Sequence, residues 1–368
     1  MASETSRRNF IKSTLTAGTA ALISLPGKRV MAATDRPVLE KKLGIALVGL
    51  GIYSTHVLAP ALQETENCYL AGIVTGTPEK EKIWADKYNI PKANIYNYEN
   101  FDSIANNPNI DIIYIVLPNS MHEEYTIRAA KAGKDVICEK PMAMSVKECQ
   151  AMIDACKQNN VTLSVGYRLH YEPHNQEVAR FAKSQKYGKV RYVHSAAAFV
   201  STFTKKDWRL QKAYGGGVLM DMGIYPILGA RYATGAWPLS VTAQTHTVDP
   251  ELYDEVEAFV TMQMEFPDNV VADLMVSFNS NASQLYVEAS KGWCELLPFS
   301  GYRGIHGRTS EGPLDFPQVN QQALQMDDVA WCIANKKPMR APGEEGMRDM
   351  HILEKVRKAI KTGKKIDI

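Results

Sequence analysis

The feature that most constrains this chain is a short apolar run that ends in a glycine-containing turn. Residues 43–50 read Leu-Gly-Ile-Ala-Leu-Val-Gly-Leu, which is typical of a buried parallel strand. The turn that follows contains Gly49 and Gly51, and a helix-like stretch then extends to Gln63. Glycines between a strand and a helix allow a tight turn and the close approach of a pyrophosphate to the backbone. The third position of this pattern is Ser54, which is small but departs from glycine, so the segment predicts a dinucleotide-binding unit with one altered position.

Strand-like and helix-like segments alternate regularly up to about residue 165. The pattern predicts strands and helices in turn over residues 70–74, 79–88, 111–117, 121–132, 135–138, 146–159 and 162–165. Such alternation indicates a doubly wound parallel sheet, the Rossmann architecture, in which ligands bind at the carboxyl ends of the strands. We therefore expect the functional residues of this half in the turns that follow the strands.

After about residue 166 the pattern changes to longer strand-like runs with few helices between them. These runs cover residues 190–199, 240–248, 258–266, 270–277 and 284–288, and helix-like segments return at 325–333 and 346–360. The pattern predicts an α+β domain with a large open, mostly antiparallel sheet, and an uncovered sheet face predicts a homo-oligomer, a dimer or a tetramer. The chain thus divides into a signal segment (1–33), a dinucleotide-binding Rossmann domain (34–165) and a substrate and oligomerisation domain (166–368).

The first 33 residues have the layout of an export signal. Arg7 and Arg8 form a twin-arginine pair, a weakly apolar stretch covers residues 13–26, and the small residues Ala32 and Ala33 mark a cleavage region. The twin arginine selects the Tat machinery, which exports folded proteins, so we expect a periplasmic protein that acquires its cofactor before export. The alternative is a basic tail beside a short helix. The apolar stretch is too short and too polar to serve as a permanent membrane anchor.

The charge distribution argues against nucleic acid as a partner. Lysine and arginine number 42 against 40 aspartates and glutamates, a formal net charge of +2. Residues 1–33 alone carry five basic side chains and one acidic side chain, which leaves a net charge of −2 for the remainder. A mature chain with this balance offers no basic footprint for a phosphate backbone.

The cysteines and histidines form no recognisable metal or redox motif. The six cysteines include no C-x-x-C pair, so we predict no structural disulfide. His170 and His174 have the spacing of two zinc ligands on one helix face, but Pro173 lies between them and no third ligand is nearby. We therefore predict no metal site and interpret His170 as a substrate contact.

The end of the second predicted strand favours NADP over NAD. NAD-binding Rossmann domains usually carry an acidic residue at this point, which binds the ribose 2′-hydroxyl. Here residues 75–80 read Thr-Gly-Thr-Pro-Glu-Lys, so no carboxylate stands at the tip. The hydroxyls of Thr75 and Thr77 and the ammonium group of Lys80 would bind a 2′-phosphate, which a carboxylate would repel. The alternative is a surface turn with a solvated lysine, and we predict NADP.

Three longer motifs carry a family resemblance. They are Cys-Glu-Lys-Pro-Met at 138–142, Gly-Tyr-Arg-Leu-His-Tyr at 166–171 and Gly-Gly-Gly-Val-Leu-Met-Asp-Met-Gly-Ile-Tyr at 215–225. Together with the glycine turn, they resemble the Gfo/Idh/MocA oxidoreductases, and in particular the glucose–fructose oxidoreductase branch. The likeness extends from residue 43 nearly to the C-terminus, and it implies a Rossmann domain followed by an open, largely antiparallel sheet.

The resemblance implies a catalytic group made of Lys140, Asp221 and Tyr225. Lys140 is the lysine of the Glu-Lys-Pro signature and would lie between the nicotinamide and the sugar. Most members have a histidine where this chain has Tyr225, and the tyrosine is a feature of the glucose–fructose branch. Oxidation of a sugar hydroxyl needs a proton acceptor, and a neighbouring ammonium group favours the phenolate form of a tyrosine. Asp221, four residues before Tyr225, would share a helix face with it and orient Lys140 or the sugar hydroxyls.

The resemblance also implies which residues bind the cofactor and the substrate. The pyrophosphate would contact Gly49, Gly51, Ile52 and Tyr53, and the adenosine ribose phosphate would contact Thr75, Thr77 and Lys80. The nicotinamide half would contact Leu117, Asn119, His122, Glu139, Lys140 and Arg168, and Trp208, Arg209 and Tyr302 would close over the cofactor. The substrate would contact Arg168, His170, Asp221 and Tyr225.

The expected function is that of an NADP-dependent sugar oxidoreductase. An aldose would be oxidised at C1 to its lactone by hydride transfer to tightly bound NADP, and a second sugar, a ketose or an aldose, would accept the hydride. The alternatives are an aldose dehydrogenase that releases NADPH, a non-catalytic sugar sensor, and a nicotinamide-dependent glycosidase of the same fold, against which the intact Glu-Lys-Pro signature and Tyr225 speak. Only residues 34–43 separate the expected cleavage point from the first strand, in place of the long arm of the branch, so retention of the cofactor is left open.

Overall fold

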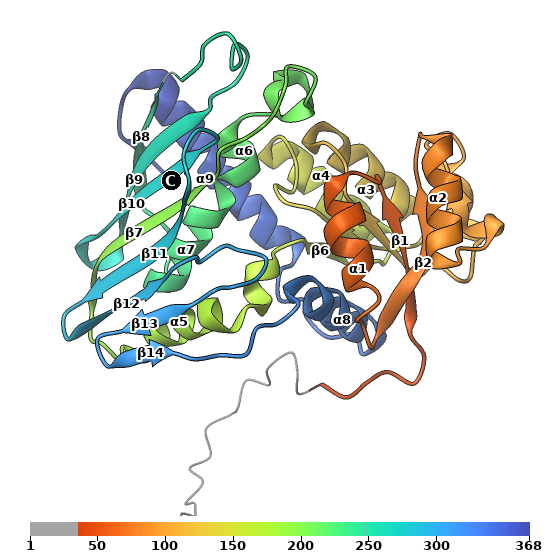
Figure 1. Ribbon diagram of the computed structural model, residues 1–368, viewed down its shortest axis with the longest axis horizontal. Coiled ribbons are helices and arrows are strands. Elements are labelled where there is room, and N and C mark those ends of the chain that lie inside the picture. Colours follow the sequence, from red (N-terminus) through yellow and green to blue (C-terminus); the bar gives the residue numbers. More distant parts are fainter. Residues whose placement is uncertain (1–35, 247) are drawn as a thin grey trace, which may run out of the picture.

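The first half of the chain forms a six-stranded parallel sheet, seen at the right of Figure 1. The computed structural model describes residues 36–246 and 248–368, and the export signal predicted at residues 1–33 lies outside the described residues. The strands are β1 (Leu43–Val48), β2 (Cys68–Val74), β3 (Ile95–Tyr96), β4 (Ile112–Ile115), β5 (Asp135–Cys138) and β6 (Leu163–Val165). Their order, β3-β2-β1-β4-β5-β6, confirms the predicted Rossmann sheet and places the change of direction between β1 and β4.

Helices cover both faces of this sheet. They are a π-helix (Ser54–Leu58) continued by α1 (Ala59–Ala61), then α2 (Pro78–Tyr88), α3 (His122–Lys131) and α4 (Val146–Gln158). Along β1, Ile45 and Leu47 pack with the π-helix, α1 and α2, whereas Ala46 and Val48 pack with α3 and α4. Burial on both faces explains why β1 is an unbroken apolar run, as is usual for parallel strands.

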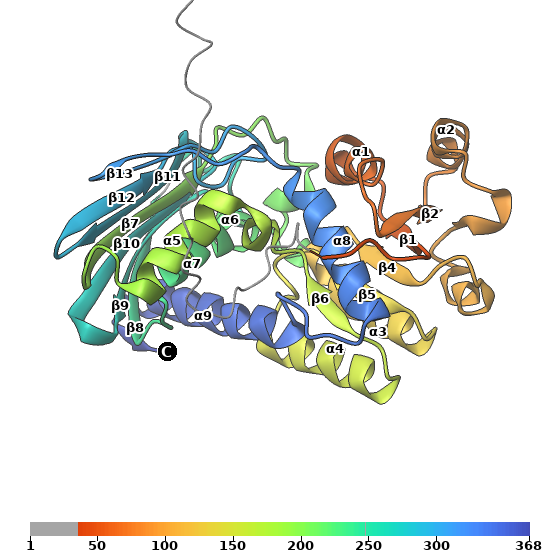
Figure 2. The ribbon, with the colours of Figure 1, turned by 90° about the horizontal axis from the view of Figure 1, so that it is seen from below.

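One helix from the C-terminal half of the sequence, α8 (Gln321–Ala334), packs on the same sheet. Its buried Met326 and Val329 join the core formed by Leu47, Ile73 and Ile112, and Figure 2 shows the helix alongside β4 and β5. A helix was predicted here, without a location. The predicted division near residue 166 therefore separates the two sheets, but it does not separate all that packs on them.

The second half of the chain forms a nine-stranded sheet. Its strands are β7 (Val190–Ala198), β8 (Ser240–Thr245), β9 (Phe259–Phe266), β10 (Val270–Ser277), β11 (Ala282–Ala289), β12 (Gly292–Leu296), β13 (Gly307–Thr309), β14 (Gly312–Leu314) and β15 (Ile366–Asp367). Their order is β14-β13-β12-β11-β7-β10-β9-β8-β15, with β7 and β10 parallel and the other pairs antiparallel. The prediction of an open, mostly antiparallel sheet is confirmed.

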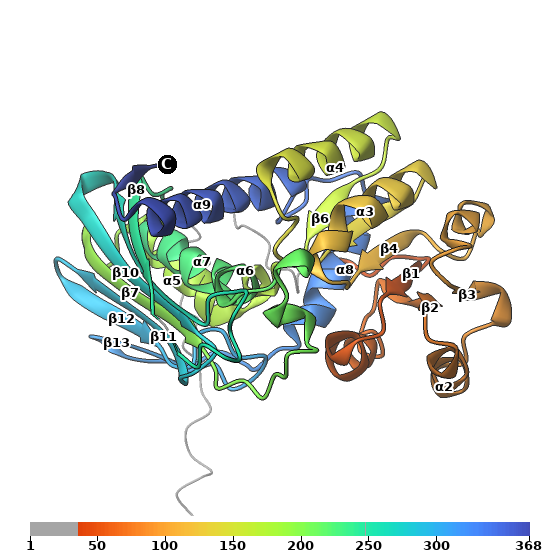
Figure 3. The ribbon, with the colours of Figure 1, turned by 90° about the horizontal axis from the view of Figure 1, so that it is seen from above.

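Four further helices pack on one face of this sheet. They are α5 (Pro173–Ser184), α6 (Val218–Met222), α7 (Ile224–Thr234) and α9 (Gly343–Thr362), and Figure 3 shows them on the face turned toward the first domain. The sequence pattern predicted few helices before residue 325 and so missed α5 and most of α7, of which only the turn shared by Asp221 and Tyr225 was expected to be helical. In α7 nearly every residue is buried, so the helix lacks the polar face that makes a period of 3.6 visible.

The described residues contain neither a metal cluster nor a disulfide. All six cysteines are buried and free, and the described ranges include no group of three or more potential ligands from His, Cys, Asp and Glu. Within the same ranges, no helix has the length and apolar character needed to cross a membrane.

Candidate active site

The glycine turn after β1 leaves an open approach to the backbone. Gly49 has a φ of +90°, and a Cβ there would lie 2.4 Å from the carbonyl oxygen of Val116, so the position requires glycine. A Cβ at Gly51 would meet nothing within 4 Å. Ser54 is fully buried, and its hydroxyl donates to the carbonyl oxygen of Gly49 at 2.6 Å. The hydrogen bond from the serine thus stabilises the turn on its buried side. A pyrophosphate would approach from the open side, at Gly51.

The residues predicted to bind a ribose phosphate lie beside this turn. Thr75 is buried, and its Oγ1 accepts a hydrogen bond from the backbone N–H of Thr77 at 3.2 Å. Lys80 reaches back from the first turn of α2, and its Nζ donates to the carbonyl oxygen of Leu50 at 2.8 Å. Glu79 also belongs to that first turn, but it is exposed. Hydroxyl and ammonium groups therefore adjoin the glycine turn, which is the donor set that a phosphate needs.

Lys140 is the centre of the cluster that is predicted to be catalytic, which is called the catalytic cluster below. It follows β5 and precedes a cis Lys140–Pro141 peptide bond, and its Nζ donates to the backbone carbonyl oxygen of Asp221 at 2.6 Å. The same Nζ lies 3.5 Å from Asp221 Oδ1 and 5.1 Å from the centroid of the Tyr225 ring. Burial by itself lowers the pKa of Lys140, but Tyr225, Asp221 and Glu139 outweigh it and raise the pKa above its usual value. The side chain is an ammonium group held against an aspartate and a tyrosine ring.

Asp221 and Tyr225 are brought together by two consecutive helices. α6 and α7 are joined at Gly223 in helical geometry, so the four-residue spacing acts as one helical turn. Asp221 Oδ2 lies 3.4 Å from Nε of Arg209, which places this carboxylate between two cations, Arg209 and Lys140. Tyr225 is 8% exposed. The aspartate is therefore placed to fix the lysine beside the tyrosine, the arrangement expected from the spacing.

Arg168 connects the end of the first sheet to a loop of the second domain. Its guanidinium carbon lies 5.0 Å from the ring centroid of Tyr225 and 4.5 Å from that of Tyr302. Its Nη1 donates to Oε1 of Gln321 at 2.6 Å, while its buried Nε has no hydrogen-bond partner. The ring centroid of Tyr302 is in turn 5.8 Å from that of Tyr53, beside the glycine turn. The structure thus brings the predicted residues Tyr53, Arg168, Tyr225 and Tyr302 into one chain of contacts.

Two side chains predicted for the nicotinamide half interact with the backbone of neighbouring loops. His122 is fully buried, and its ring nitrogens each lie 2.9 Å from a carbonyl oxygen, Nε2 from that of Leu117 and Nδ1 from that of Pro141. Burial lowers the pKa of His122. Asn119 Nδ2 donates to the carbonyl oxygen of Gly215 at 2.8 Å. These side chains fasten the loops after β4 and β5 to the glycine-rich segment before α6.

Glu139 lies buried at the base of the cluster. Its Oε1 accepts a hydrogen bond from the hydroxyl of Tyr114 at 2.7 Å, and its Oε2 accepts one from the backbone N–H of Lys140 at 3.2 Å. A Cβ at Gly166 would be 2.6 Å from Oε1, so this close approach depends on glycine. Burial raises the pKa of Glu139, and the bond from Tyr114 and the charges of Lys140 and Arg168 oppose that rise.

His170 belongs to a different network. Its Nδ1 lies 2.8 Å from the hydroxyl oxygen of Tyr232, and its Nε2 lies 3.3 Å from Oε1 of Glu345. Burial opposes ionisation of Glu345, but His170 and Arg231 lower its pKa to about 2. Tyr232 is seven residues after Tyr225 on α7, so the residue that His170 contacts lies two helical turns from Tyr225. Its interpretation as a substrate contact stays a prediction.

The remaining predicted residues lie at the rim. Arg209 packs its guanidinium carbon 4.6 Å from the ring of Trp208, in a short 3₁₀ turn (Trp208–Leu210). Ile52 is 77% exposed beside the glycine turn. Rim positions of this kind suit residues that close over a ligand.

Four buried polar residues that contact the site were missed. They are Tyr114, Gln321, Gln322 and Gln325, which are at most 2% exposed and hydrogen-bond to Glu139, Arg168, Tyr53 and Tyr114 respectively. A signal was present, because glutamines at 321, 322 and 325 are interspersed with apolar residues in a helix that also carries Asp327 and Asp328. Sequence periodicity alone does not show that this helix returns to the first sheet.

Two family models cover most of the described chain. Residues 43–167 match the model of an oxidoreductase family with an NAD-binding Rossmann fold, and residues 175–295 match that of the GFO/IDH/MocA C-terminal domain. The chain belongs to the Gfo/Idh/MocA family. It is an oxidoreductase, and the resemblance to this family that was drawn from its motifs is confirmed.

Individual relatives of this Gfo/Idh/MocA protein include sugar enzymes. The crystal structure of an aldose-aldose oxidoreductase from Caulobacter crescentus, complexed with glycerol, is 38% identical, with a TM-score of 0.86 over 89% of this chain and 100% of that one. A D-xylose 1-dehydrogenase [NADP(+)] of Haloarcula marismortui is 29% identical over 90% of this chain and 93% of its own length. A levoglucosan dehydrogenase, 20% identical with a TM-score of 0.76, shares the fold.

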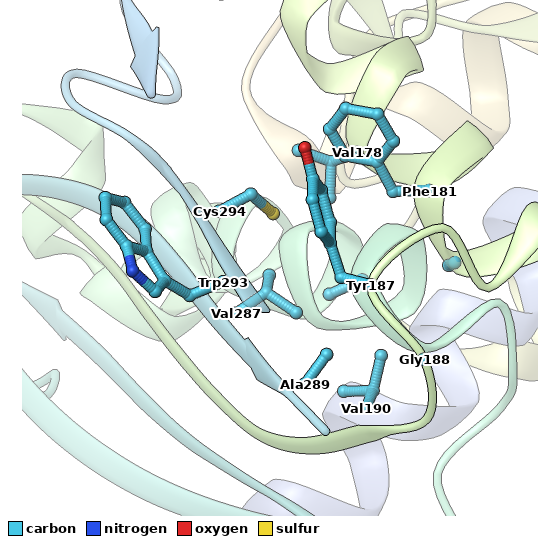
Figure 4. Close-up of a pocket in the computed structure, with 11 residues that line it drawn as sticks. Val178, Phe181, Tyr187, Gly188, Val190, Val287, Ala289, Trp293 and Cys294 are labelled. Carbon is cyan, nitrogen blue, oxygen red and sulfur yellow. The ribbon is translucent and has the colours of Figure 1, made fainter. Parts of the chain in front are cut away.

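A small cavity lies away from the catalytic cluster, between α5 and the second sheet (Figure 4). Its lining includes Val178, Phe181, Tyr187, Val287 and Cys294, and its volume is about 20 Å³. That space holds about one water molecule. It is too small for a sugar, and no residue of the catalytic cluster lines it.

Proposed function

We propose that this protein oxidises an aldose at C1 to the corresponding lactone with NADP as the hydride acceptor, and that a second sugar then accepts the hydride. The observation that carries the proposal is the position of the Lys140 ammonium group, between Asp221 and the ring of Tyr225, directly after β5. In a doubly wound sheet, this edge is where dinucleotide and substrate meet. The likeness to the aldose-aldose oxidoreductase supports the choice of substrate class and the role of a second sugar.

NADP fits the groups that the chain presents. The open side at Gly51 admits a pyrophosphate, and Thr75, Thr77 and Lys80 offer donors for the 2′-phosphate. When bound, NADP supplies a nicotinamide ring that accepts a hydride from the sugar carbon. The likeness to a dehydrogenase named for NADP(+) supports the choice of NADP.

The chain's own residues manage the proton of the sugar hydroxyl. Tyr225, as the phenolate, takes the proton from the C1 hydroxyl, and the ammonium group of Lys140 donates a hydrogen bond to the sugar oxygen as negative charge develops there. Asp221 holds Lys140 in place through its backbone oxygen and its carboxylate. Arg168 lies close to the same tyrosine ring, so two cations restrict its orientation.

An aldose dehydrogenase that exchanges NADPH with solution is the second candidate. The likeness to D-xylose 1-dehydrogenase over 90% of the chain favours it. The two candidates share the oxidation of the first sugar at C1. They differ in what removes the hydride afterwards, a second sugar or the departure of NADPH.

Both candidates can be tested on the purified mature protein with no nucleotide added. We would add glucose, and separately xylose, and follow the absorbance of reduced nicotinamide; a rise of about one equivalent per chain that a second sugar reverses supports the two-sugar reaction. Turnover only after NADP is supplied supports the dehydrogenase instead. No reduction with a panel of aldoses in the presence of NADP would overturn both.

We also propose that the protein reaches the periplasm through the Tat machinery. The proposal rests on Arg7, Arg8 and the weakly apolar stretch after them. Replacing Arg7 and Arg8 by lysine should leave the precursor in the cytoplasm. Equal periplasmic yields of the two forms would contradict the proposal.

A homo-oligomer built on the nine-stranded sheet is part of the same proposal. No described helix covers the face of the sheet opposite α7, and this face carries half-buried Tyr192, Val271 and Met275. An uncovered face with such side chains favours association. Light scattering should give the mass of a dimer or tetramer, and a monomer at micromolar concentration would contradict this.

A further inference from the structure

Helix α8 presents a row of buried polar side chains to the site. Gln321, Gln322, Gln325 and Asp328 are each at most 2% exposed. A buried amide or carboxylate is costly unless it is hydrogen-bonded, so their partners matter. Their four partners lie in or beside the motifs predicted to hold cofactor and substrate. Gln321 bonds to Arg168, Gln322 to Tyr53, Gln325 to Tyr114 and Asp328 to Tyr171. The proposed chemistry uses none of the amides directly.

The contact of Gln325 is the most informative, because it continues to Glu139. Nε2 of Gln325 donates to the hydroxyl oxygen of Tyr114 at 3.1 Å, and that hydroxyl donates to Oε1 of Glu139 at 2.7 Å. A tyrosine hydroxyl has a single proton. Because the amide of Gln325 donates a hydrogen bond to the Tyr114 oxygen, the hydroxyl's own hydrogen points to the Glu139 carboxylate. The polarity of the chain of bonds is therefore fixed from α8 toward the cluster.

We propose that Gln325 is a positioning residue for the oxidation, which locks the Tyr114 hydroxyl toward Glu139 and so keeps that carboxylate ionised beside Lys140. This inference rests on the proposed function, since Lys140 matters only if the cluster performs sugar chemistry. A protonated Glu139 would no longer offer a full negative charge next to Lys140, and the ammonium group would lose one of the charges that stabilise it.

Several groups face Glu139 from the elements packed around it. Burial raises its pKa, and the hydrogen bond from Tyr114 acts in the opposite direction. The titratable and charged neighbours are Tyr53 from the glycine turn, Tyr114 from β4, Cys138 from β5, Lys140 from the next loop, Arg168 after β6 and Tyr302 from the second domain. The cations Lys140 and Arg168 both favour the carboxylate form of Glu139. Loss of the hydrogen bond from Tyr114 therefore raises the pKa of Glu139 but does not prevent its ionisation.

The test compares Gln325→Leu, Gln325→Glu and Tyr114→Phe in the full chain. The Glu variant is nearly isosteric, but its carboxylate accepts a hydrogen bond from the Tyr114 hydroxyl. The hydroxyl then points away from Glu139, and the direction of the hydrogen bonds is reversed. In Tyr114→Phe and Gln325→Glu the pKa of Glu139 rises, because the hydrogen bond to its charged form is lost. In Gln325→Leu the Tyr114 hydroxyl keeps Glu139 as an acceptor but is no longer locked toward it, so the rise is smaller. We expect the acid limb of kcat/KM to move to higher pH, with a loss of about tenfold on the acid side and recovery at alkaline pH. Tyr114→Phe combined with Gln325→Leu should lose no more than Tyr114→Phe alone.

Val329→Ala is the matched control on the same helix. Val329 is buried on the apolar face of α8, so its truncation should lower the melting temperature and leave the acid limb where it is. A Gln325→Glu variant with the pH profile of the unmodified protein would overturn the proposal. So would an equal shift of the acid limb in Val329→Ala, because that would make the effect one of packing.

A readout without sugar separates this proposal from the proposed function. A carboxyl group with a raised pKa in the folded state binds more protons than in the unfolded state, so stability falls as pH rises from the unfolded to the folded pKa. In Tyr114→Phe and Gln325→Glu, this fall should continue to higher pH in a series of melting temperatures. If no aldose is oxidised but the fall in stability extends to higher pH in these variants, the role of the hydrogen bonds from Gln325 to Glu139 is supported and the proposed sugar oxidation is contradicted. An unchanged pH dependence in both variants overturns the bond chain itself.

Discussion

The glycine turn after β1 and the catalytic cluster after β5 differ in how they depend on side chains. At the glycine turn, two positions function because they have no side chain, Gly49 for its φ of +90° and Gly51 for the free space beside it. In the cluster, the roles proposed for Lys140, Asp221 and Tyr225 depend on charge and a hydroxyl group. The first region should fail when an atom is added, and the second when a charge is removed.

The two regions also differ in how the chain assembles them. The glycine turn and the neighbouring residues 75–80 follow adjacent parallel strands of one sheet, so local structure is sufficient to bring them together. The cluster needs the loop after β5, the α6–α7 junction and the loop that contains Tyr302. These segments meet only when the two domains are docked, and α8 is one of the elements that dock them.

The largest effect should follow removal of the Lys140 charge. In Lys140→Met we expect the rate of sugar oxidation to fall by about a thousandfold, because the developing charge on the sugar oxygen loses its donor. The fold should persist, since Asp221 keeps its contact with Arg209. Single-turnover reduction by glucose measures the rate, and circular dichroism reports the fold. A variant that keeps a tenth of the original rate would show that the charge is dispensable.

Removal of the Tyr225 hydroxyl should have the next largest effect. We expect Tyr225→Phe to lower kcat by about a hundredfold, the usual range for a lost acid–base group. Tyr232→Phe is the matched control, because it removes the same atom two turns later on α7, where the partner is His170. A similar loss of kcat in both variants would place the whole helix, rather than Tyr225, in control of the rate.

The different ways of assembling the two regions explain what the sequence could predict. The Rossmann sheet, the glycine turn and Lys140 follow from patterns within a few residues, because a strand, its turn and the next helix are neighbours in the chain. Asp221 and Tyr225 came from the family resemblance, and their spacing alone left core and capping roles open. The largely buried α7 gave no amphipathic signal, although it carries Tyr225.

The contacts made by α8 were beyond the reach of sequence patterns for a physical reason. Gln325 and Tyr114 are separated by 211 positions and meet because α8 packs across the first sheet. The contacts of His170 with Tyr232 and Glu345 are a second case, because its motif gave no sign of them. Local patterns assign residue types to elements, but docking between elements decides what each side chain faces.

Adding one methyl group to the glycine turn tests whether this region depends on the absence of a side chain. Gly51→Ala meets no neighbour, so the fold should be unchanged, but the new methyl group occupies the side from which a pyrophosphate approaches. We expect the affinity for NADP to fall about tenfold, or about 1.4 kcal/mol. The measurements are the Kd for NADP and the fraction of purified chains that retain nucleotide. Unaltered values would place the dinucleotide elsewhere.

Gly49→Ala is the companion variant at the same turn. Its Cβ would lie 2.4 Å from the Val116 carbonyl oxygen at a φ of +90°, and we expect a loss of roughly 3 kcal/mol in folding free energy. Melting temperature and soluble yield should therefore fall before any affinity can be compared. Equal melting temperatures for the two alanine variants would contradict the different roles assigned to the two glycines.

The smallest effect on activity should come from Arg36, which anchors α8 from outside the site. Its Nη1 lies 2.8 Å from Oδ1 of the fully buried Asp328, whose Oδ2 is 3.5 Å from Nε of Arg340. Arg36→Ala leaves that carboxylate with a single arginine, and we expect a loss of about 2 kcal/mol in a urea titration, less than for a pair left with no partner. Asp328→Asn in the same chain should restore part of it, because the amide carries no charge. If Arg36→Ala instead lowered the rate as strongly as Tyr225→Phe, the catalytic cluster would depend on the seating of α8 as much as on its own charges.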